Sequence, residues 1–394
     1  MKRLFISLLT LSVALAGCRN QVAENAEVQP PQSAPELSAQ EQAKFREMAK
    51  QVLFWSDEER SRHFRAMEDV FPGTTAKATN PRALEQGAPL TGLDAQIDTF
   101  MAETGVAGLM MLKDGKIVLE RYGLGLGAED RWTSFSVAKS FTSTLVGAAV
   151  KDGLIASLDD PVTKYIPDLA GGAYDDVNVR QLLTMTSGVR WNEDYTDPES
   201  DVVQMSAQES VRGENPLVSY MKALPREAAP GEKWVYKTGE TNLIGLLVAN
   251  ATGRQMSDYA EEKITGPAGF AGDMFWMTDL SGDNLGGCCL SLRLADYARM
   301  GQWVMSGAQP SVPEDWTAEA TATAANVGRP GYGYGYQWWT YPEEAYGAQG
   351  IFGQAITIVP ERNIVIAMVS NWETATGLRN RQIDMFGKMI AAVE

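Results

Sequence analysis

The residues best suited to chemistry are Ser136 and Lys139, which lie three positions apart within residues 134–142. If a helix begins near Ser136, this spacing puts the serine hydroxyl and the lysine amine on one face of its first turn. A serine hydroxyl attacks poorly at neutral pH unless a neighbouring group takes its proton. The pair is therefore predicted to be a nucleophile beside a possible base.

Lysine is the candidate base because the chain has a single histidine, His63, which lies in an expected helix ahead of the catalytic domain. A G-x-S-x-G nucleophile elbow is also missing, so a Ser-His-Asp arrangement is disfavoured. A lysine amine accepts a proton only if its pKa falls from about 10.4 toward 7, a difference of roughly 4 kcal/mol. Burial and the positive end of the helix dipole both lower that pKa.

A second pair with this spacing, Ser219 and Lys222, lies in a segment with the pattern of an ordinary amphipathic helix. We expect Ser219 on the solvated face of that helix. The run after Ser136 is apolar instead, and polar residues in its first turn are costly to bury without a purpose. The alternative there is a capped core helix whose lysine extends toward water.

Two further segments could complete a catalytic site. Tyr236 precedes a helix expected from about Thr241, and a tyrosine hydroxyl beside a lysine can pass a proton between nucleophile and leaving group. Residues 347–354 are rich in glycine and lead into a strand, whose edge could place the backbone N–H of Ile351 opposite that of Ser136 as an oxyanion hole. Taken singly, a packed loop tyrosine and a bulge that requires glycine remain alternatives.

The composition sets the broad class of the protein. The chain has 394 residues, of which 44% are hydrophobic, so it can bury a sizeable core and global disorder is excluded. Its net charge is −16, with 34 Lys and Arg against 50 Asp and Glu. Because this charge would repel a phosphate backbone, nucleic acid is excluded as a partner.

The amino terminus has the layout of an export signal. Lys2 and Arg3 precede an apolar run at 4–15 that is too short for an ordinary spanning helix. Residues 15–18 resemble the bacterial lipobox, which implies a lipid-modified Cys18 and a membrane-anchored lipoprotein. By the same resemblance, Arg rather than Asp at position 19 suggests the outer membrane, facing the periplasm. A plain signal peptide with an incidental cysteine is the alternative.

The remaining cysteines, Cys288 and Cys289, are adjacent. A disulfide between neighbouring residues is strained, so two separate small buried side chains are predicted. With one histidine and one cysteine pair, the usual zinc-site spacings cannot be assembled. We therefore expect no metal and no cofactor.

The pattern along the chain predicts a mixed α/β (α+β) fold. Strands are expected at 106–112 and 117–122, joined by an Asp114-Gly115 hairpin turn, and again at 355–359 and 364–369. Strands early and late with helices between them imply one antiparallel sheet from both ends of the domain, flanked by helices, with an inserted helical lobe. The expected units are a signal peptide at 1–17, a flexible lipid-anchored tether at 18–40, a helical N-terminal extension and connection at 41–92, and a hydrolase domain at 93–394, with its helical lobe at about 150–305.

Together these segments resemble the serine β-lactamase-like superfamily, which includes class C β-lactamases, DD-peptidases and related carboxylesterases. The resemblance rests on Ser136-Val137-Ala138-Lys139, on residues 181–188, on Tyr236, on Gly286-Gly287 and on residues 347–353. It implies that Ser136 is the acylated nucleophile, Lys139 its general base and Tyr236 the proton shuttle. The backbone N–H groups of Ser136 and Ile351 would form the oxyanion hole.

Two departures from that pattern bear on the substrate. Thr238 stands where the tyrosine element usually ends in asparagine, and it could still bond the lysine or the substrate. Ala348-Gln349 supplies no cation where the third element usually has Lys or His, which argues against penicillin recognition. The 6-aminohexanoate-dimer hydrolases look most similar, because Tyr195 occupies a loop that contributes an active-site tyrosine in that group.

The sequence thus predicts an exported serine hydrolase that cleaves small esters or linear amides, with Tyr195, Thr238, Gln349 and Gly350 contacting the substrate. One alternative is a catalytically idle member that binds cell-wall peptides or a protein partner. Another is a D-amino-acid peptidase or β-lactamase. The oligomeric state and the natural substrate are not predicted.

Overall fold

The computed structural model describes residues 38–209 and 213–393. The signal peptide, Cys18 and nearly all of the tether lie outside the described residues, so the export and lipid anchoring stay predictions. None of the helices in the described ranges is long and apolar enough to cross a membrane.

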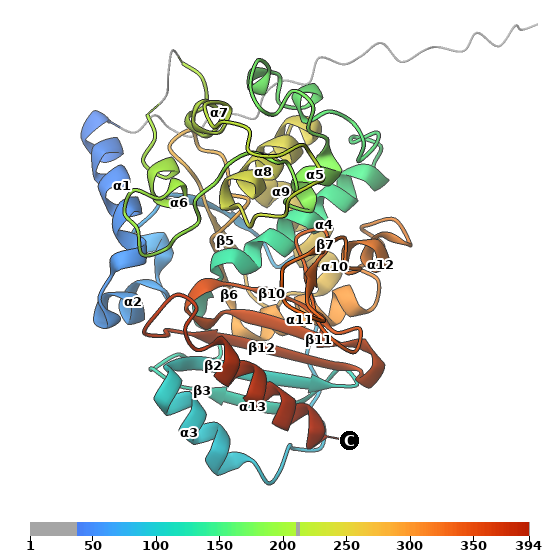
Figure 1. Ribbon diagram of the computed structural model, residues 1–394. Helices are drawn as coiled ribbons and strands as arrows, with labels where there is room; N and C mark the ends of the chain where they lie inside the picture. Colours follow the sequence, from blue (N-terminus) through green and yellow to red (C-terminus); the bar gives the residue numbers. More distant parts are fainter. Residues whose placement is uncertain (1–37, 210–212, 394) are drawn as a thin grey trace, which may run out of the picture.

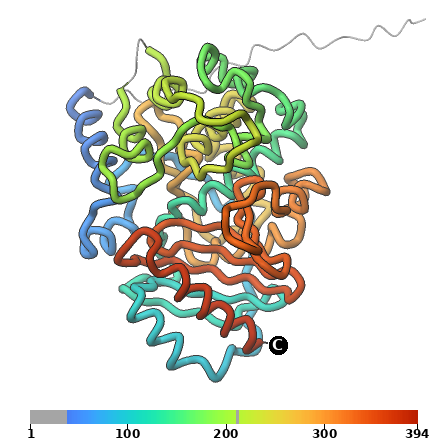
Figure 2. The backbone as a smooth tube through the Cα atoms, in the orientation of Figure 1, coloured from blue at the N-terminus to red at the C-terminus, as the bar shows by residue number. Residues whose placement is uncertain are grey.

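The core of the molecule is an eight-stranded antiparallel sheet made from both ends of the catalytic domain (Figure 1). Its strands, in spatial order, are β3 (Lys116–Tyr122), β2 (Val106–Lys113), β12 (Ile364–Ser370), β11 (Ala355–Val359), β10 (Tyr346–Gln349), β9 (Trp339–Thr340), β8 (Gly333–Tyr334) and β7 (Ala325–Asn326). The predicted sheet is confirmed. Figure 2 shows the early and late segments, cyan and red, side by side at one end of the molecule.

Local sequence explains the order of this sheet. Asp114 and Gly115 both have positive φ, 52° and 75°, as the predicted two-residue turn between β2 and β3 requires. Every residue of β12 is buried, which suits an apolar strand covered on both faces. Helix α11 (Leu294–Met305) packs on one face, and α3 (Asp94–Thr104) and α13 (Arg379–Ala391) lie on the other (Figure 1).

Most other helices form a lobe above the sheet (Figure 1). They are α4 (Ala138–Lys151), α5 (Val179–Leu183), α6 (Asp201–Met205), α7 (Pro216–Lys222), α8 (Thr238–Thr252), α9 (Met256–Ala260), α10 (Gly266–Ala268) and α12 (Trp316–Ala320). Short 3-10 turns occur at Val52–Phe54, Met67–Asp69, Phe135–Val137, Val162–Lys164, Pro167–Leu169, Ile351–Gly353 and Pro360–Arg362, and a π-helical turn at Glu261–Thr265. The apolar helix α4 packs against α8 at the centre of the lobe.

A second sheet was not predicted. It has four strands in the order β1 (Gly73–Ala76), β5 (Met274–Met277), β6 (Leu290–Arg293) and β4 (Arg131–Thr133). The expectation of helices up to about residue 305 is therefore wrong at β5 and β6. Four-residue runs are too short to separate a strand from a buried helical segment by periodicity.

The N-terminal extension shares the core of the catalytic domain. It consists of α1 (Ala39–Gln51), α2 (Asp57–His63) and β1. The ring of Phe64 packs against Trp132, Phe135 and Phe352. The Phe64 carbonyl accepts a 2.7 Å hydrogen bond from the Thr133 N–H, at the end of the strand that leads to Ser136. The extension therefore lies next to the candidate nucleophile.

Candidate active site

Ser136 lies in a short 3-10 turn between β4 and α4, close to the predicted helix start. The preceding residue, Phe135, has a φ of 43°, a left-handed conformation that a bulky residue rarely adopts. Packing holds it there, because its ring lies 4.9 Å from that of Phe64 and 5.4 Å from that of Phe352, between centroids. The serine is thus presented by a fixed turn.

The Lys139 amine lies within hydrogen-bonding reach of the Ser136 hydroxyl, as predicted. Its Nζ is 3.2 Å from Ser136 Oγ, 3.0 Å from Thr238 Oγ1 and 2.8 Å from the Gly287 carbonyl oxygen. The side chain is 1% exposed. Burial lowers the pKa of Lys139 to about 8, although the charge of Glu193 acts in the opposite direction. About a tenth of the amine is then neutral at pH 7.

The hydrogen-bond partners of Lys139 determine how its amine would be oriented when it is neutral. The Gly287 carbonyl can only accept a hydrogen bond. The Thr238 hydroxyl gives its own proton to Glu193, so its oxygen accepts from Lys139. Both protons of a neutral amine are then committed, and its lone pair is left facing Ser136 Oγ. That is the orientation that a general base requires.

Glu193 was not predicted, and it organises this side of the site. Its carboxylate accepts hydrogen bonds from the Thr238 hydroxyl, from the Thr238 backbone N–H at 2.9 Å, from Trp191 Nε1 and from the Tyr195 hydroxyl at 3.0 Å. It comes from a loop with several acidic residues at 193–201, where a carboxylate is usually solvated. Only the fold brings Glu193 to Thr238, 45 positions further along the chain.

Replacing Glu193 with glutamine is expected to shift the acidic limb of the pH profile of kcat/KM to lower pH. The Glu193 charge raises the pKa of Lys139, so its removal lets burial lower that pKa further. Steady-state kinetics on an ester substrate from pH 5 to 10 measure the limb. A merely structural role would reduce kcat/KM at every pH and leave the limb in place, which would contradict this assignment. Asp194→Asn, in the same loop, is the matched control.

Tyr236 also lies beside Ser136, and Lys139 Nζ is 5.2 Å from the centre of its ring. Its hydroxyl is hydrogen-bonded to the Ser136 hydroxyl, and its ring stacks on Trp339 at 5.7 Å between centroids. Burial, and next the charge of Glu193, raise the pKa of Tyr236 well above its usual range, although the bond to Ser136 lowers it in part. The phenol therefore stays protonated and is suited to donate a proton. The helix that follows, α8, begins at Thr238 rather than at about Thr241.

The end of β10 approaches the nucleophile closely. A Cβ on Gly350 would lie 2.5 Å from the Ser134 carbonyl oxygen and 3.2 Å from Phe135 Cβ, so only glycine permits this contact. The following residue, Ile351, lines the same cavity as Ser136. Ser136 and Ile351, the two residues predicted to form the oxyanion hole, therefore border the same cavity.

The other predicted substrate contacts lie in two places. Tyr195 and Thr238 line the cavity at Ser136. The Gln349 amide instead donates to the Tyr341 hydroxyl at 2.7 Å and borders a second cavity, between β10, β11 and α13. The Gly350 carbonyl accepts a 3.0 Å hydrogen bond from Arg379 Nη2.

Arg379 supplies a cation that the sequence pattern of the third element lacks. It begins helix α13, 29 residues after Gly350, so inspection of Ala348-Gln349 could not reveal it. Burial lowers the pKa of Arg379 to about 10, and the nearby phenols of Tyr341, Tyr236 and Tyr195 oppose that shift. The residue remains cationic at neutral pH. Arg379 lines the second cavity, beside Gln349, and not the cavity at Ser136.

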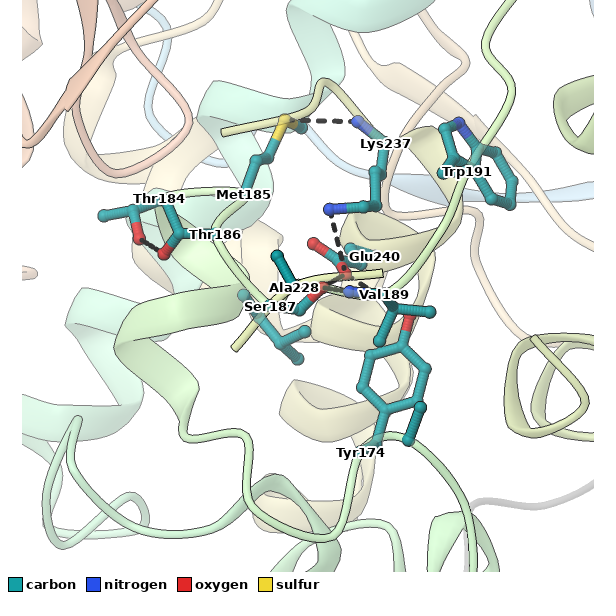
Figure 3. Close-up of polar contacts among 12 residues, drawn as sticks. Tyr174, Thr184, Met185, Thr186, Ser187, Val189, Trp191, Ala228, Lys237 and Glu240 are labelled. Atoms are coloured by element: carbon teal, nitrogen blue, oxygen red, sulfur yellow. Dashed lines mark hydrogen bonds and ion pairs between the residues drawn. The ribbon is translucent and has the colours of Figure 1, made fainter. Parts of the chain in front are cut away.

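A buried ion pair fixes the segment that carries Tyr236 and Thr238. Lys237 Nζ lies 3.6 Å from Glu240 Oε1, and both side chains are fully buried (Figure 3). Glu240 also accepts hydrogen bonds from Ser187 and, at 3.3 Å, from the Tyr174 hydroxyl. Burial raises the pKa of Glu240, and Lys237 opposes that shift. Ser187 belongs to residues 181–188, one of the segments on which the predicted resemblance rests. Through its bond to Glu240, this segment supports the part of the chain that carries Tyr236 and Thr238.

The remaining sequence candidates lie elsewhere. His63 packs its ring against Trp55 in the N-terminal extension. Ser219 and Lys222 lie on α7, where the lysine donates to the Asp168 carbonyl, as expected of a surface helix. Among residues 38–209 and 213–393, no group of three His, Cys, Asp or Glu side chains is placed to hold a metal ion.

The prediction for the cysteine pair is wrong. Cys288 and Cys289 are joined by a disulfide that borders the cavity at Ser136. Disulfides between adjacent cysteines are rare, so the sequence favoured two separate side chains. The turn that brings the two sulfurs together depends on the fold and cannot be read from the two residues alone.

Comparison with known proteins identifies relatives for most of the chain. A family sequence model described as Beta-lactamase matches residues 93–384. The chain is 25% identical over 335 residues to a 6-aminohexanoate-dimer hydrolase of Paenarthrobacter ureafaciens, covering 78% of this chain and 84% of that protein. It is 24% identical over 181 residues to a beta-lactamase of Pseudomonas fluorescens, covering 44% of this chain and 47% of that protein.

A solved structure from Bacillus anthracis, proposed to be a 6-aminohexanoate-dimer hydrolase, has the same fold. The TM-score is 0.77 at 19% identity, covering 86% of this chain and 95% of that one. The match to the family sequence model starts at residue 93, so the N-terminal extension lies outside it.

Proposed function

The chain belongs to the beta-lactamase family of serine hydrolases, and on that premise we propose that it cleaves small linear amides or esters through an acyl-enzyme on Ser136. The observation that carries the proposal is the Lys139 amine, 3.2 Å from Ser136 Oγ with two acceptors for its protons. The similarity to the 6-aminohexanoate-dimer hydrolase favours linear amides over β-lactams.

In the proposed acylation, neutral Lys139 takes the Ser136 proton while Oγ attacks the substrate carbonyl carbon. The carbonyl oxygen becomes an oxyanion that the N–H groups of Ser136 and Ile351 stabilise. When the tetrahedral intermediate collapses, the bond to the leaving group breaks and the leaving group takes a proton from the Tyr236 hydroxyl. The Lys139 ammonium then returns its proton to Tyr236.

Deacylation repeats these steps with water as the nucleophile. Lys139 takes a proton from the water, whose oxygen attacks the acyl carbon. The bond from that carbon to Ser136 Oγ breaks, the Lys139 ammonium gives its proton to that oxygen, and the carboxylic acid leaves. Two modest barriers replace one high barrier.

A substrate panel tests the proposal. Purified full-length protein is assayed with 4-nitrophenyl acetate, 6-aminohexanoyl-4-nitroanilide and the cephalosporin nitrocefin. We expect turnover of the ester and the linear anilide. Turnover of nitrocefin alone would favour the β-lactamase alternative. No turnover of any member would favour the idle, ligand-binding alternative.

A further inference from the structure

The cavity at Ser136 has almost entirely apolar walls. Ser136, Thr238 and Ile351 form its reactive end, and aliphatic side chains and a disulfide form most of the remainder. Removing an apolar chain from water into such a cavity is favourable in proportion to the area buried. A small polar acyl group would gain little from these walls.

One wall of this cavity comes from the N-terminal extension. Ala49 on α1, and Val52 and Leu53 directly after it, line the cavity, and all three precede the part of the chain that matches the family sequence model. Helix α1 packs against α6, whose Val202 also lines the cavity. Near the surface, an ion pair of 3.3 Å joins Arg46 of α1 to Glu209, in the segment that follows α6.

The position of Tyr236 decides which half of the substrate enters the cavity. Tyr236 packs against Trp234 and Trp339, rings that are not among the residues lining the cavity. In the proposed mechanism the leaving group takes its proton from Tyr236 and therefore departs on that side. The cavity lies on the remaining side of the scissile bond, where the acyl group lies.

We propose that this cavity binds an unbranched apolar acyl chain and that the N-terminal extension sets the preferred chain length. This inference rests on the proposed function, because it assigns the acyl half of the same reaction. The proposed substrates are esters or amides of medium-length aliphatic acids.

One carboxyl group at the cavity could suggest a different acyl chain. Asp279 borders it, but Asp279 Oδ1 accepts the backbone N–H groups of Ser281 at 2.8 Å and Asp283 at 3.0 Å. Burial, and next the neighbouring Asp283, raise the pKa of Asp279 to about 7. With Oδ1 tied into its own turn, Asp279 offers only Oδ2 to a bound chain, within walls that are otherwise almost entirely apolar. We therefore expect a methyl-terminated chain to bind better than an amino-terminated one.

The test compares kcat/KM for the 4-nitrophenyl esters of acetate, butyrate, hexanoate and 6-aminohexanoate with full-length protein. Each added methylene is expected to raise kcat/KM about fourfold up to hexanoate. Flat values across the series, or 6-aminohexanoate exceeding hexanoate, would overturn the inference while leaving the proposed function intact. Absence of all hydrolysis would instead refute the proposed function.

Variants test the role of the extension. Ala49→Trp is expected to lower the hexanoate-to-acetate ratio of kcat/KM at least tenfold, because its ring would occupy the cavity. Val202→Trp narrows the cavity from α6 and should act in the same direction if Ala49→Trp fails to fold. Glu47→Trp, exposed on the same helix α1, is the matched control and should keep the wild-type ratio. An unchanged ratio in folded Ala49→Trp and Val202→Trp would contradict the proposed wall.

Discussion

Replacing Ser136 with alanine is expected to lower kcat for 4-nitrophenyl ester hydrolysis by about 10⁴-fold or more, as the loss of a catalytic serine does in other serine hydrolases. The reason is that the second hydroxyl beside Lys139, that of Thr238, is not free to replace the Ser136 hydroxyl. Thr238 Oγ1 also lies within reach of Lys139, at 3.0 Å, but it is hydrogen-bonded to Glu193. The measurement is the initial rate at saturating substrate, with the folded state checked by circular dichroism.

The chain offers a matched control for this prediction. Ser219→Ala alters the second serine with a lysine three positions later, on the surface of α7. It should leave kcat unchanged. Retention of most activity in Ser136→Ala would contradict the assignment of the nucleophile.

Replacing Lys139 with methionine is expected to lower kcat/KM about 10³-fold, within the usual range for the loss of a general base. Methionine preserves the length of the buried side chain and removes the basic nitrogen. In the wild type, kcat/KM should rise as pH increases through about 8, because only the neutral amine can accept the Ser136 proton. Below that pH the amine is protonated and the rate should fall about tenfold per pH unit.

The pH dependence separates a catalytic lysine from a structural one. The residual activity of Lys139→Met should lack the limb near pH 8, and Lys222→Met, the matched control on α7, should keep it. Survival of that limb in Lys139→Met would show that another group titrates.

Local spacing, together with the apolar run that follows Ser136, was enough to predict the reacting groups. A spacing of three positions puts Ser136 and Lys139 on one face of a helical turn, and the observed distance of 3.2 Å between Nζ and Oγ agrees with it. The hairpin turn at Asp114-Gly115 was likewise predicted from two adjacent residues. The large sheet followed from the order of apolar runs, since strands at both ends of the domain had to pair with each other.

The orientation of these groups could not be predicted from spacing. Thr238 was predicted to bond either the lysine or the substrate, and it bonds the lysine. The direction of that bond depends on Glu193, which lies in another loop. Arg379 reaches Gly350 from the last helix, and the N-terminal extension supplies a wall of the cavity. Each of these contacts joins segments that are far apart in the sequence. No periodic pattern of residues indicates that such segments meet.

The most direct test of the central claim is covalent labelling with a fluorophosphonate, followed by intact-protein mass spectrometry and peptide mapping. The account predicts one adduct per chain, on Ser136, formed more slowly below pH 8 and at a greatly reduced rate in Lys139→Met. Labelling at another residue, or equal rates in the wild type and Lys139→Met, would contradict it.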